Sequence, residues 1–279
     1  MKPVLKWAGG KRLLIPEIAK YINKQKMEEK GHRYFEPFVG GGAVCFHLKI
    51  KDSVINDINT ELINVYTQIR DNPTELIKKL KEHKNKYSSE YYEKIRVLDR
   101  EPDFSSKPAV LRAARFIFLN KTCYNGLYRV NSFGHFNVPE GKYKNPDIVS
   151  ENNIKKLSKF LNEKNISIRN VDFEESVRDA KAGDVVYFDP PYDYEYEGFN
   201  GYNVDAFDRE NLKRLKRVAD DLTNRGCKVI ISNNNTKFVN DLFDSENYTI
   251  EYVEANRFIN CDGKGRKKVR EVIIYGEKK

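Results

Sequence analysis

The segment Val185-Val186-Tyr187-Phe188-Asp189-Pro190-Pro191-Tyr192 decides how the chain is interpreted, because it joins a strand pattern to polar and aromatic groups. Val185–Phe188 is β-branched and aromatic, which predicts a buried strand of a parallel sheet. The two prolines lack N–H groups and end the strand, so their carbonyls are free for a ligand. Asp189 then lies at the carboxyl end of a strand, where open α/β sheets place their sites. An acceptor, a rigid turn and the ring of Tyr192 suit an amine on a planar heterocycle, although a plain strand and proline turn fit equally well.

The composition describes a polar, basic chain. Its 279 residues include 50 Lys and Arg against 41 Asp and Glu, a net charge of +9, which favours a polyanionic partner. Solubility is the alternative reason for so many mixed charges. The four cysteines and four histidines are scattered without a C-x-x-C pair, so we expect no metal site and a reducing compartment. No apolar run reaches membrane-spanning length and the N-terminus does not match a signal peptide, so we expect a cytoplasmic protein without a membrane partner.

A predicted strand, a glycine loop and a helix start follow one another near the N-terminus. The strand covers Arg33–Phe38, the loop is Gly40-Gly41-Gly42, and the helix begins in Ala43–Leu48. This order brings a backbone close to a cofactor. Cys45 stands where G-x-G-x-x-G has its third glycine, which weakens the case for a bound pyrophosphate.

Acidic residues end or follow further predicted strands. Asp57 closes the short strand that starts at Val54 and lies 17 residues after Gly40, a spacing that suits a ribose diol. A glycine loop and a ribose acid without a phosphate-binding loop suit a nucleoside cofactor such as S-adenosylmethionine. Asp172-Phe173 follows a predicted strand at Ile166–Ile168 and could hold an adenine ring. Trp7, in Lys6–Lys11, is either a core residue or a ligand contact.

The middle of the chain changes character. Residues Thr60 to Leu119 show helical periodicity without a strand pattern, which predicts a helical insertion into an α/β domain. The loop Asn120–Lys144 follows, with Asn125-Gly126 as its strongest hairpin signal. Aromatic residues alternate there with Asn, Arg and Lys, which favours nucleic-acid contact over a solvated hairpin. Arg129 is a candidate for guanine recognition, and Tyr124 or Tyr128 could wedge between bases.

The α/β pattern then resumes. We expect helices at Glu151–Leu161 and from Asp208 to Arg225, a strand at Lys228–Ser232, and a closing hairpin of Ile250–Glu254 with Val269–Tyr275. The loop Asp193–Phe207 is either a mobile lid or disordered. The basic run Gly263–Arg270 is either a solvated turn or a phosphate contact.

Taken together, these motifs resemble the Dam-like DNA adenine-N6 methyltransferases, the α class of amino-methyltransferases. In that class the glycine motif comes first, the recognition region lies in the middle, and D-P-P-Y comes late. This chain has the same order in Phe38–Gly42, Tyr124–Leu127 with Phe136–Pro139, and Asp189–Tyr192. One departure is Val171, where relatives often have Gly.

The resemblance implies a fold and a reaction. The fold is a Rossmann-like α/β methyltransferase sheet, formed by residues 1–58 and 148–279, with a mostly helical target-recognition domain at 59–147. The reaction moves a methyl group from S-adenosylmethionine to N6 of an adenine flipped out of double-stranded DNA, within GATC, and leaves S-adenosylhomocysteine. We expect a monomer. The alternatives are methylation of adenine in RNA, methylation of cytosine N4 in DNA, and a catalytically silent nucleic-acid-binding subunit.

The resemblance also implies roles for individual residues. The catalytic set is Asp189, Pro190 and Tyr192. The cofactor set is Trp7, Lys11, Asp57 and Asp189, with the pocket lined by Phe38, Gly40, Asp172 and Phe173. The DNA-binding set is Lys6, Leu127, Arg129 and Pro139, with Tyr124 wedged into the base stack and Asn125 on the backbone. No metal is implied.

Overall fold

The computed structural model describes residues 1–7, 11, 14–193, 207–255 and 269–278. Three features named above lie wholly or largely outside these ranges. They are the glycine pair of the Lys6–Lys11 segment, the loop Asp193–Phe207 and the basic run Gly263–Arg270.

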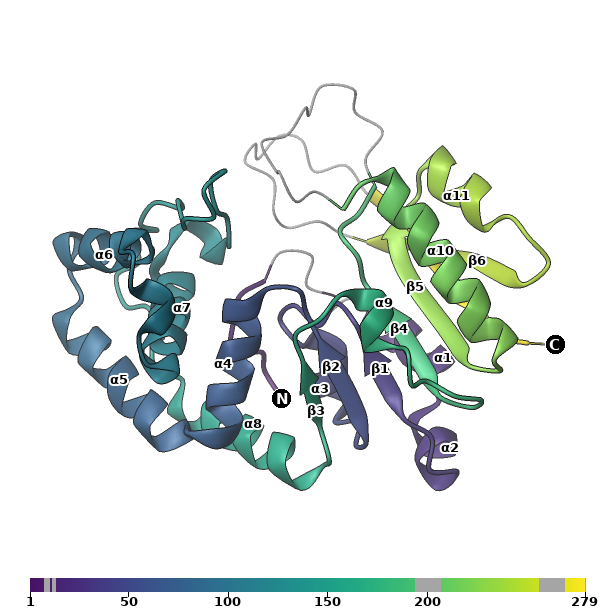
Figure 1. Ribbon diagram of the computed structural model, residues 1–279, viewed down its shortest axis with the longest axis horizontal. Coiled ribbons are helices and arrows are strands. Elements are labelled where there is room, and N and C mark those ends of the chain that lie inside the picture. Colours follow the sequence, from purple (N-terminus) through teal and green to yellow (C-terminus); the bar gives the residue numbers. More distant parts are fainter. Residues whose placement is uncertain (8–10, 12–13, 194–206, 256–268, 279) are drawn as a thin grey trace.

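A seven-stranded sheet forms the centre of the described chain, and it confirms the predicted α/β fold (Figure 1). Its strand order is β3-β2-β1-β4-β5-β7-β6, with β5 and β6 antiparallel to β7 and all other pairs parallel. The order reverses between β1 and β4, and the carboxyl ends of strands beside such a point are where open α/β sheets bind ligands. The strands are β1 Tyr34–Glu36, β2 Ser53–Asn56, β3 Ser167–Arg169, β4 Val185–Phe188, β5 Lys228–Asn234, β6 Tyr248–Ala255 and β7 Val269–Gly276.

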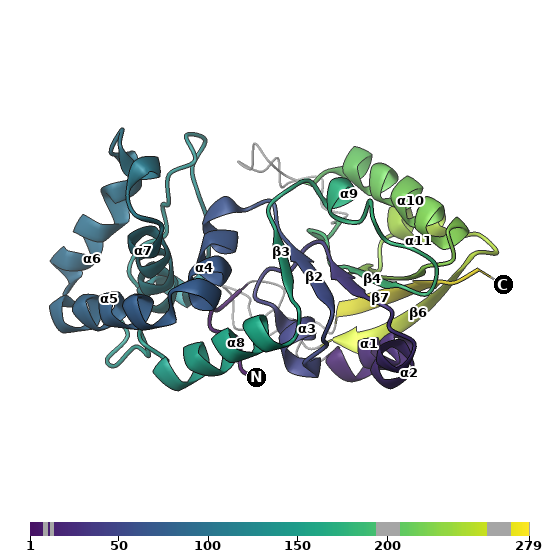
Figure 2. The ribbon, with the colours of Figure 1, turned by 60° about the horizontal axis from the view of Figure 1, so that its bottom comes forward.

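Both faces of the sheet are covered, which explains why its strands are so apolar. Side chains alternate between the faces along each strand. On one face Tyr34 and Tyr187 join a core with α1 (Ile15–Ile22) and α3 (Ala43–Leu48). On the other face Phe35 and Phe188 join a second core. That core includes residues of α9 (Phe173–Ser176), α10 (Arg209–Asn224) and α11 (Lys237–Phe243), which lie across the sheet from α1 and α3 (Figure 2).

The predicted helical insertion is present between β2 and β3, to one side of the sheet (Figure 1). Its helices α4 and α5 pack on α7, and α8 packs on α4 and α5 before the chain returns to the sheet. The core of this helical part is continuous with the core under the α1 face of the sheet. The helices are α4 Thr60–Asp71, α5 Pro73–Lys86, α6 Ser89–Arg96, α7 Ala109–Thr122 and α8 Glu151–Glu163, and the remaining helix α2 is Lys24–Glu29.

The loop after α7 reverses direction at a different place from the one predicted. Asn125-Gly126 does not form the hairpin turn, because Gly126 N–H donates to the Cys123 carbonyl and closes a single 3-10 turn, Tyr124–Gly126. The chain turns back at Asn131–His135, and isolated antiparallel bridges pair Val130 with Phe136 and Cys123 with Glu140. Residues 123–140 are called the hairpin below.

Gly42 allows a substitution test of the glycine loop. It begins α3 with φ +67°, and a Cβ added there would overlap the ring of Phe46. Gly31 has nearly the same φ, +66°, but has open space around its Cα. We predict that Gly42→Ala lowers the free energy of unfolding by about 2 to 5 kcal/mol, since it adds overpacking to backbone strain, whereas Gly31→Ala costs only about 1 to 2 kcal/mol. Denaturant unfolding measures both values, and equal losses would contradict the role given to Phe46.

Candidate active site

The carboxylate that follows β4 holds a buried cation. Asp189 Oδ1 lies 2.8 Å from Lys11 Nζ, and the Lys11 side chain is only 6% exposed. The same ammonium group lies 4.3 Å from the centroid of the Tyr192 ring. The structure thus brings three predicted site residues together and places a positive nitrogen between a carboxylate and an aromatic face.

The electrostatics of Asp189 follow from this enclosure. Burial raises the pKa of its carboxyl to about 6, although the neighbouring Lys11 ammonium opposes the rise and the Glu271 carboxylate adds to it. At neutral pH the carboxyl is therefore mostly ionised, and the Lys11 ammonium favours that charged form. Pro190 is buried and Pro191 is exposed, so the turn has one side against the protein.

Tyr192 is held by its hydroxyl group. The hydroxyl donates to Glu271 Oε2 at 2.8 Å, and Glu271 is a buried residue of β7. Burial, with the nearby Asp189 and Glu271 carboxylates, raises the pKa of the Tyr192 phenol well above its usual value. The ring therefore stays neutral and keeps one orientation, with Lys11 over its face.

Asp193 fixes the chain directly after this turn. Its carboxylate accepts from Arg209 Nε at 3.0 Å and from the Thr236 hydroxyl at 2.7 Å. Its N–H donates to Asn233 Oδ1 at 3.0 Å, and its carbonyl accepts from Asn234 Nδ2 at 2.6 Å. The end of the turn is thus bonded to β5 and to the first residue of α10, which limits how far Tyr192 can shift.

The glycine loop after β1 is held from three sides. Gly40 N–H donates to Asp57 Oδ2 at 3.0 Å, and the Gly40 carbonyl accepts from the Tyr66 hydroxyl at 2.5 Å. The indole of Trp7 covers the loop so closely that a Cβ on Gly40 would lie 2.8 Å from Nε1. Trp7 also stacks on Tyr128 of the hairpin, with ring centroids 5.7 Å apart. Trp7 therefore lies between the glycine loop and the hairpin.

A second buried acid lies beneath this loop. Glu36 ends β1 and accepts from the Tyr34 hydroxyl and from Cys45 N–H, both at 3.0 Å. Burial raises the pKa of Glu36 to about 8, and the charge of Asp189 contributes to the rise. Cys45, which replaces the third glycine of the dinucleotide motif, therefore gives its N–H to a protein carboxyl rather than to a phosphate.

An apolar surface lies beside Asp57 and at the carboxyl end of β3. Phe38 and Phe173 stack with centroids 5.4 Å apart, and Ile58 is 72% exposed. Asp57 Oδ1 also accepts from Asn59 N–H at 3.0 Å. Asp172, which was expected to hold an adenine ring, already has partners in the protein. Its Oδ1 accepts from Glu174 N–H and pairs with Arg214, and the Arg214 guanidinium also lies over the ring of Phe173.

The predicted DNA-binding residues lie on or beside the hairpin. Lys6 Nζ lies 4.1 Å from the Tyr143 ring centroid, and the Lys6 backbone bonds to Asn120 in both directions. Tyr124 is 45% exposed, and its N–H donates to the Pro139 carbonyl at 2.8 Å.

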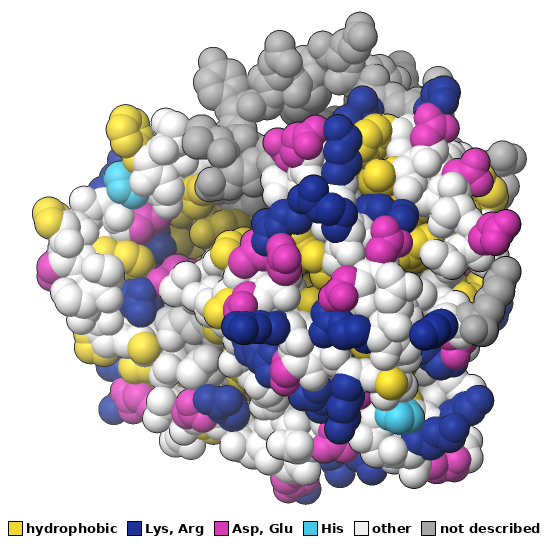
Figure 3. All heavy atoms as spheres, turned by 45° about the vertical axis from the view of Figure 1, so that its right-hand side comes forward, with side chains coloured by type: hydrophobic (Ala, Val, Ile, Leu, Met, Phe, Trp, Pro, Cys, Tyr) yellow, Lys and Arg dark blue, Asp and Glu magenta, His cyan; other side chains and the backbone are white. Residues whose placement is uncertain are grey.

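The remaining three predicted DNA-binding residues differ in exposure. Asn125 and Arg129 are exposed, and Arg129 Nε donates to Asn137 Oδ1 at 2.7 Å. Leu127 is half-buried and packs against the core. Away from the hairpin, the face in Figure 3 shows Lys and Arg interspersed with Asp and Glu rather than a patch of one sign.

Sequence reasoning missed four residues of this site. Glu271 could have been noticed as an acid within the apolar strand β7, and Glu36 as an acid before a proline in β1. Asp193 was grouped with the following loop, and its partners Arg209 and Thr236 are distant in the sequence. Ile58 carries no local signal, because an isoleucine at a strand end is normally buried.

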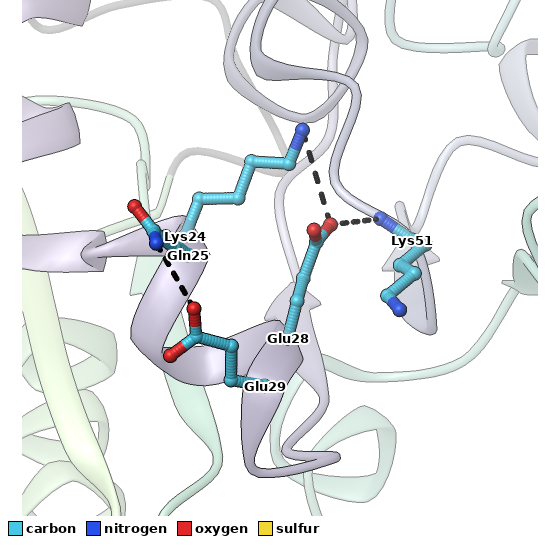
Figure 4. A pocket seen from close by; sticks show the side chains of 5 residues that line it. All are labelled: Lys24, Gln25, Glu28, Glu29 and Lys51. Carbon is cyan, nitrogen blue, oxygen red and sulfur yellow. Dashed lines mark hydrogen bonds and ion pairs between the residues drawn. The ribbon is translucent and has the colours of Figure 1, made fainter.

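A hollow of about 410 Å³ beside α2 is lined by polar side chains that bond to one another or to nearby backbone (Figure 4). Its lining is Lys24, Gln25, Glu28, Glu29 and Lys51. The described residues contain no group of three or more His, Cys, Asp or Glu placed to hold a metal ion. None of the described helices has the length and apolar character needed to span a membrane.

Comparisons with known proteins agree with one another. Residues 7–259 match the family model of the D12 class N6 adenine-specific DNA methyltransferases. The chain is 41% identical to the type II methyltransferase M1.LlaDCHI of Lactococcus lactis, over 99% of this chain and 96% of that protein. It is 41% identical to the type II methyltransferase M.MjaIII of Methanocaldococcus jannaschii, over 98% of both. It is 31% identical to the DNA adenine methylase of Escherichia coli K12, over 96% of this chain and 93% of that protein.

The Lys11–Asp189 pair predicts a titration result. Lys11→Met removes the cation that lowers the pKa of Asp189, so that pKa should rise above its value of about 6. Carboxyl ¹³C chemical shifts against pH measure it, with the Asp189 signal assigned from its absence in Asp189→Asn. An unchanged or lower midpoint in Lys11→Met would show that the two groups are not paired in solution.

Proposed function

Because the chain belongs to the D12 class N6 adenine-specific DNA methyltransferase family, we propose that it transfers a methyl group from S-adenosylmethionine to N6 of an adenine in duplex DNA. One observation carries the proposal. The Lys11 nitrogen, held by Asp189 over the ring of Tyr192, has the surroundings that an exocyclic amine gaining positive charge requires. The site thus suits an amine nucleophile.

The residues around the glycine loop fit the proposed cofactor. The Asp57 carboxylate keeps lone pairs beyond those used by Gly40 and Asn59, so it can accept from a ribose diol. The exposed Ile58 beside it, with half-buried Phe38, offers apolar surface to an adenine ring. Because Asp172 Oδ1 is already bonded, a contact with the adenine amine would use Oδ2. When bound, the cofactor supplies an electrophilic methyl group.

Two groups of this chain would orient the reacting nitrogen. N6 is paired inside a duplex, so the target adenine must leave the stack to reach the site. Its ring would lie on Tyr192 and its N6–H groups would donate to the Asp189 carboxylate and the Pro190 carbonyl. Lys11 must first leave this position, because its ammonium group occupies it. The negative charge of Asp189 then stabilises the positive charge that develops on N6.

Residues 59–147 are proposed as the recognition unit, with GATC as the first site to test. Arg129 donates from Nε to Asn137 Oδ1 and, over a long 3.5 Å, from Nη2 to the Asn137 carbonyl. The remaining guanidinium N–H groups can meet the O6 and N7 acceptors of a guanine. Tyr124, whose N–H donates to the Pro139 carbonyl, is exposed enough to enter the base stack. Lys6, whose side chain lies against Gly126, would read base edges together with Leu127 and Pro139, and Asn125 would contact the DNA backbone.

The direct test of the proposed function is to follow a radiolabelled methyl group from the cofactor into DNA. Radiolabelled S-adenosylmethionine is incubated with duplex DNA containing GATC, and the DNA is digested to nucleosides. We predict labelled N6-methyladenine. Asp189→Ala should lower the single-turnover rate by about 10²-fold or more, because it removes an acceptor that stabilises developing charge. Glu210→Gln, which alters only an exposed pair with Lys213 on α10, is the control and should retain the wild-type rate.

Each alternative function has its own outcome in this assay. Label in N4-methylcytosine would assign the chain to cytosine chemistry. Label that appears only in a parallel incubation in which RNA replaces the duplex would change the substrate. Protein that binds DNA and transfers no label would be a silent subunit. An Asp189→Ala variant with the wild-type rate would overturn the proposed role of the carboxylate.

A further inference from the structure

The turn of the hairpin presents an aromatic ring to solvent. Phe133 is 80% exposed, more than any other large hydrophobic side chain among the described residues reported as exposed. Its nearest aromatic neighbour is His135, whose ring centroid lies 6.3 Å away. A single exposed phenylalanine is common on protein surfaces, so its meaning depends on how it is held and on what surrounds it.

The backbone on both sides of Phe133 is fixed. Asn131 Oδ1 accepts from the N–H groups of Phe133 and His135, both at 3.0 Å. Gly134 N–H donates to the Asn131 carbonyl at 2.9 Å, and Asn131 N–H donates to the His135 carbonyl at 2.9 Å. The ring is therefore presented by an ordered turn. Because the backbone of that turn is already fixed, the turn loses little conformational entropy when a partner binds.

The chain segment that carries the turn is basic, and the acid that contacts the turn from outside it, Asp99, is paired with Arg115. Between Lys121 and Asn145 the sequence has four Lys or Arg residues and one acid, a balance of +3. The acid is Glu140, which accepts from the Tyr87 hydroxyl at 2.6 Å and from the Ser89 hydroxyl at 2.7 Å. Exposed Arg129 lies on the same hairpin, beside the bridge between Val130 and Phe136. A two-stranded β-ribbon can enter the major groove of duplex DNA, and the hairpin is a pair of antiparallel segments joined by two isolated bridges.

We propose that Phe133 is a specificity-determining residue that contacts the C5-methyl group of a thymine in the major groove, near the base pair that Arg129 reads. The proposal rests on the proposed function. Thymine carries the one apolar group among the base edges of that groove, and phenylalanine is a side chain that contacts it. Arg129 would supply hydrogen bonds to a guanine, whereas Phe133 would supply an apolar contact to the methyl group of a thymine.

Uracil substitution tests this contact without changing base pairing. Each thymine of a duplex that the protein methylates is replaced in turn by uracil, which removes the methyl group alone, and the dissociation constant is measured for wild type and Phe133→Ala. At one position, uracil should weaken wild-type binding by about 3- to 10-fold, the value of one methyl contact. Phe133→Ala should bind the thymine duplex at least that much more weakly and should not distinguish thymine from uracil at that position.

Leu111→Ala is the matched control, since Leu111 is another exposed apolar residue, at the start of α7. It should bind DNA as wild type does, and thermal unfolding should show that both variants fold. Phe133→Ala with wild-type affinity, or with undiminished sensitivity to the same uracil, would overturn the proposal while wild-type methylation still upholds the proposed function. A wild-type protein that neither binds nor methylates DNA would contradict the proposed function itself.

Discussion

The ion pair between Lys11 and Asp189 is the contact on which the site depends. It joins a residue near the N-terminus to the end of a central strand, across the point where the strand order reverses. Burial raises the pKa of this carboxyl, and the neighbouring ammonium group opposes the rise and so favours the charged form. Tyr192 closes the arrangement from the other side and is itself fixed by Glu271. The protein thus holds a half-buried carboxylate against a lysine, and under the proposed function the amine of the substrate would replace that lysine.

The segment that carries Lys11 is also bonded to the hairpin. Asn120 accepts from Lys6 N–H and donates to the Lys6 carbonyl, and it donates to the carbonyl of Gly126 as well. Trp7 packs over the glycine loop on one side and stacks on Tyr128 on the other. Lys6 and Trp7 therefore contact the end of α7, the hairpin and the glycine loop.

Local patterns predicted much of the fold. Val185–Phe188 is β4 as expected, Ala43–Leu48 is α3, and the Asp208 side chain caps α10. Periodicity and capping depend on neighbouring residues, so they can be seen in the sequence. The pairing of Lys11 with Asp189, the support of Tyr192 by Glu271, and the bonds of Asp193 join distant residues, so no local pattern indicates them. Asn125-Gly126 shows the opposite case, because this strong hairpin pattern does not form a hairpin turn. It lies in a 3-10 turn directly after α7, where the Asn120 side chain donates to the Gly126 carbonyl.

The most direct measurement is a crystal structure of the chain with S-adenosylhomocysteine and a duplex that contains its methylation site. The account predicts an adenine outside the stack on the ring of Tyr192, with N6 within hydrogen-bond distance, about 2.7 to 3.2 Å, of the Asp189 carboxylate and the Pro190 carbonyl. It also predicts that Lys11 Nζ has left Asp189. A bound duplex whose flipped adenine lies elsewhere while Lys11 still pairs with Asp189 would contradict the account.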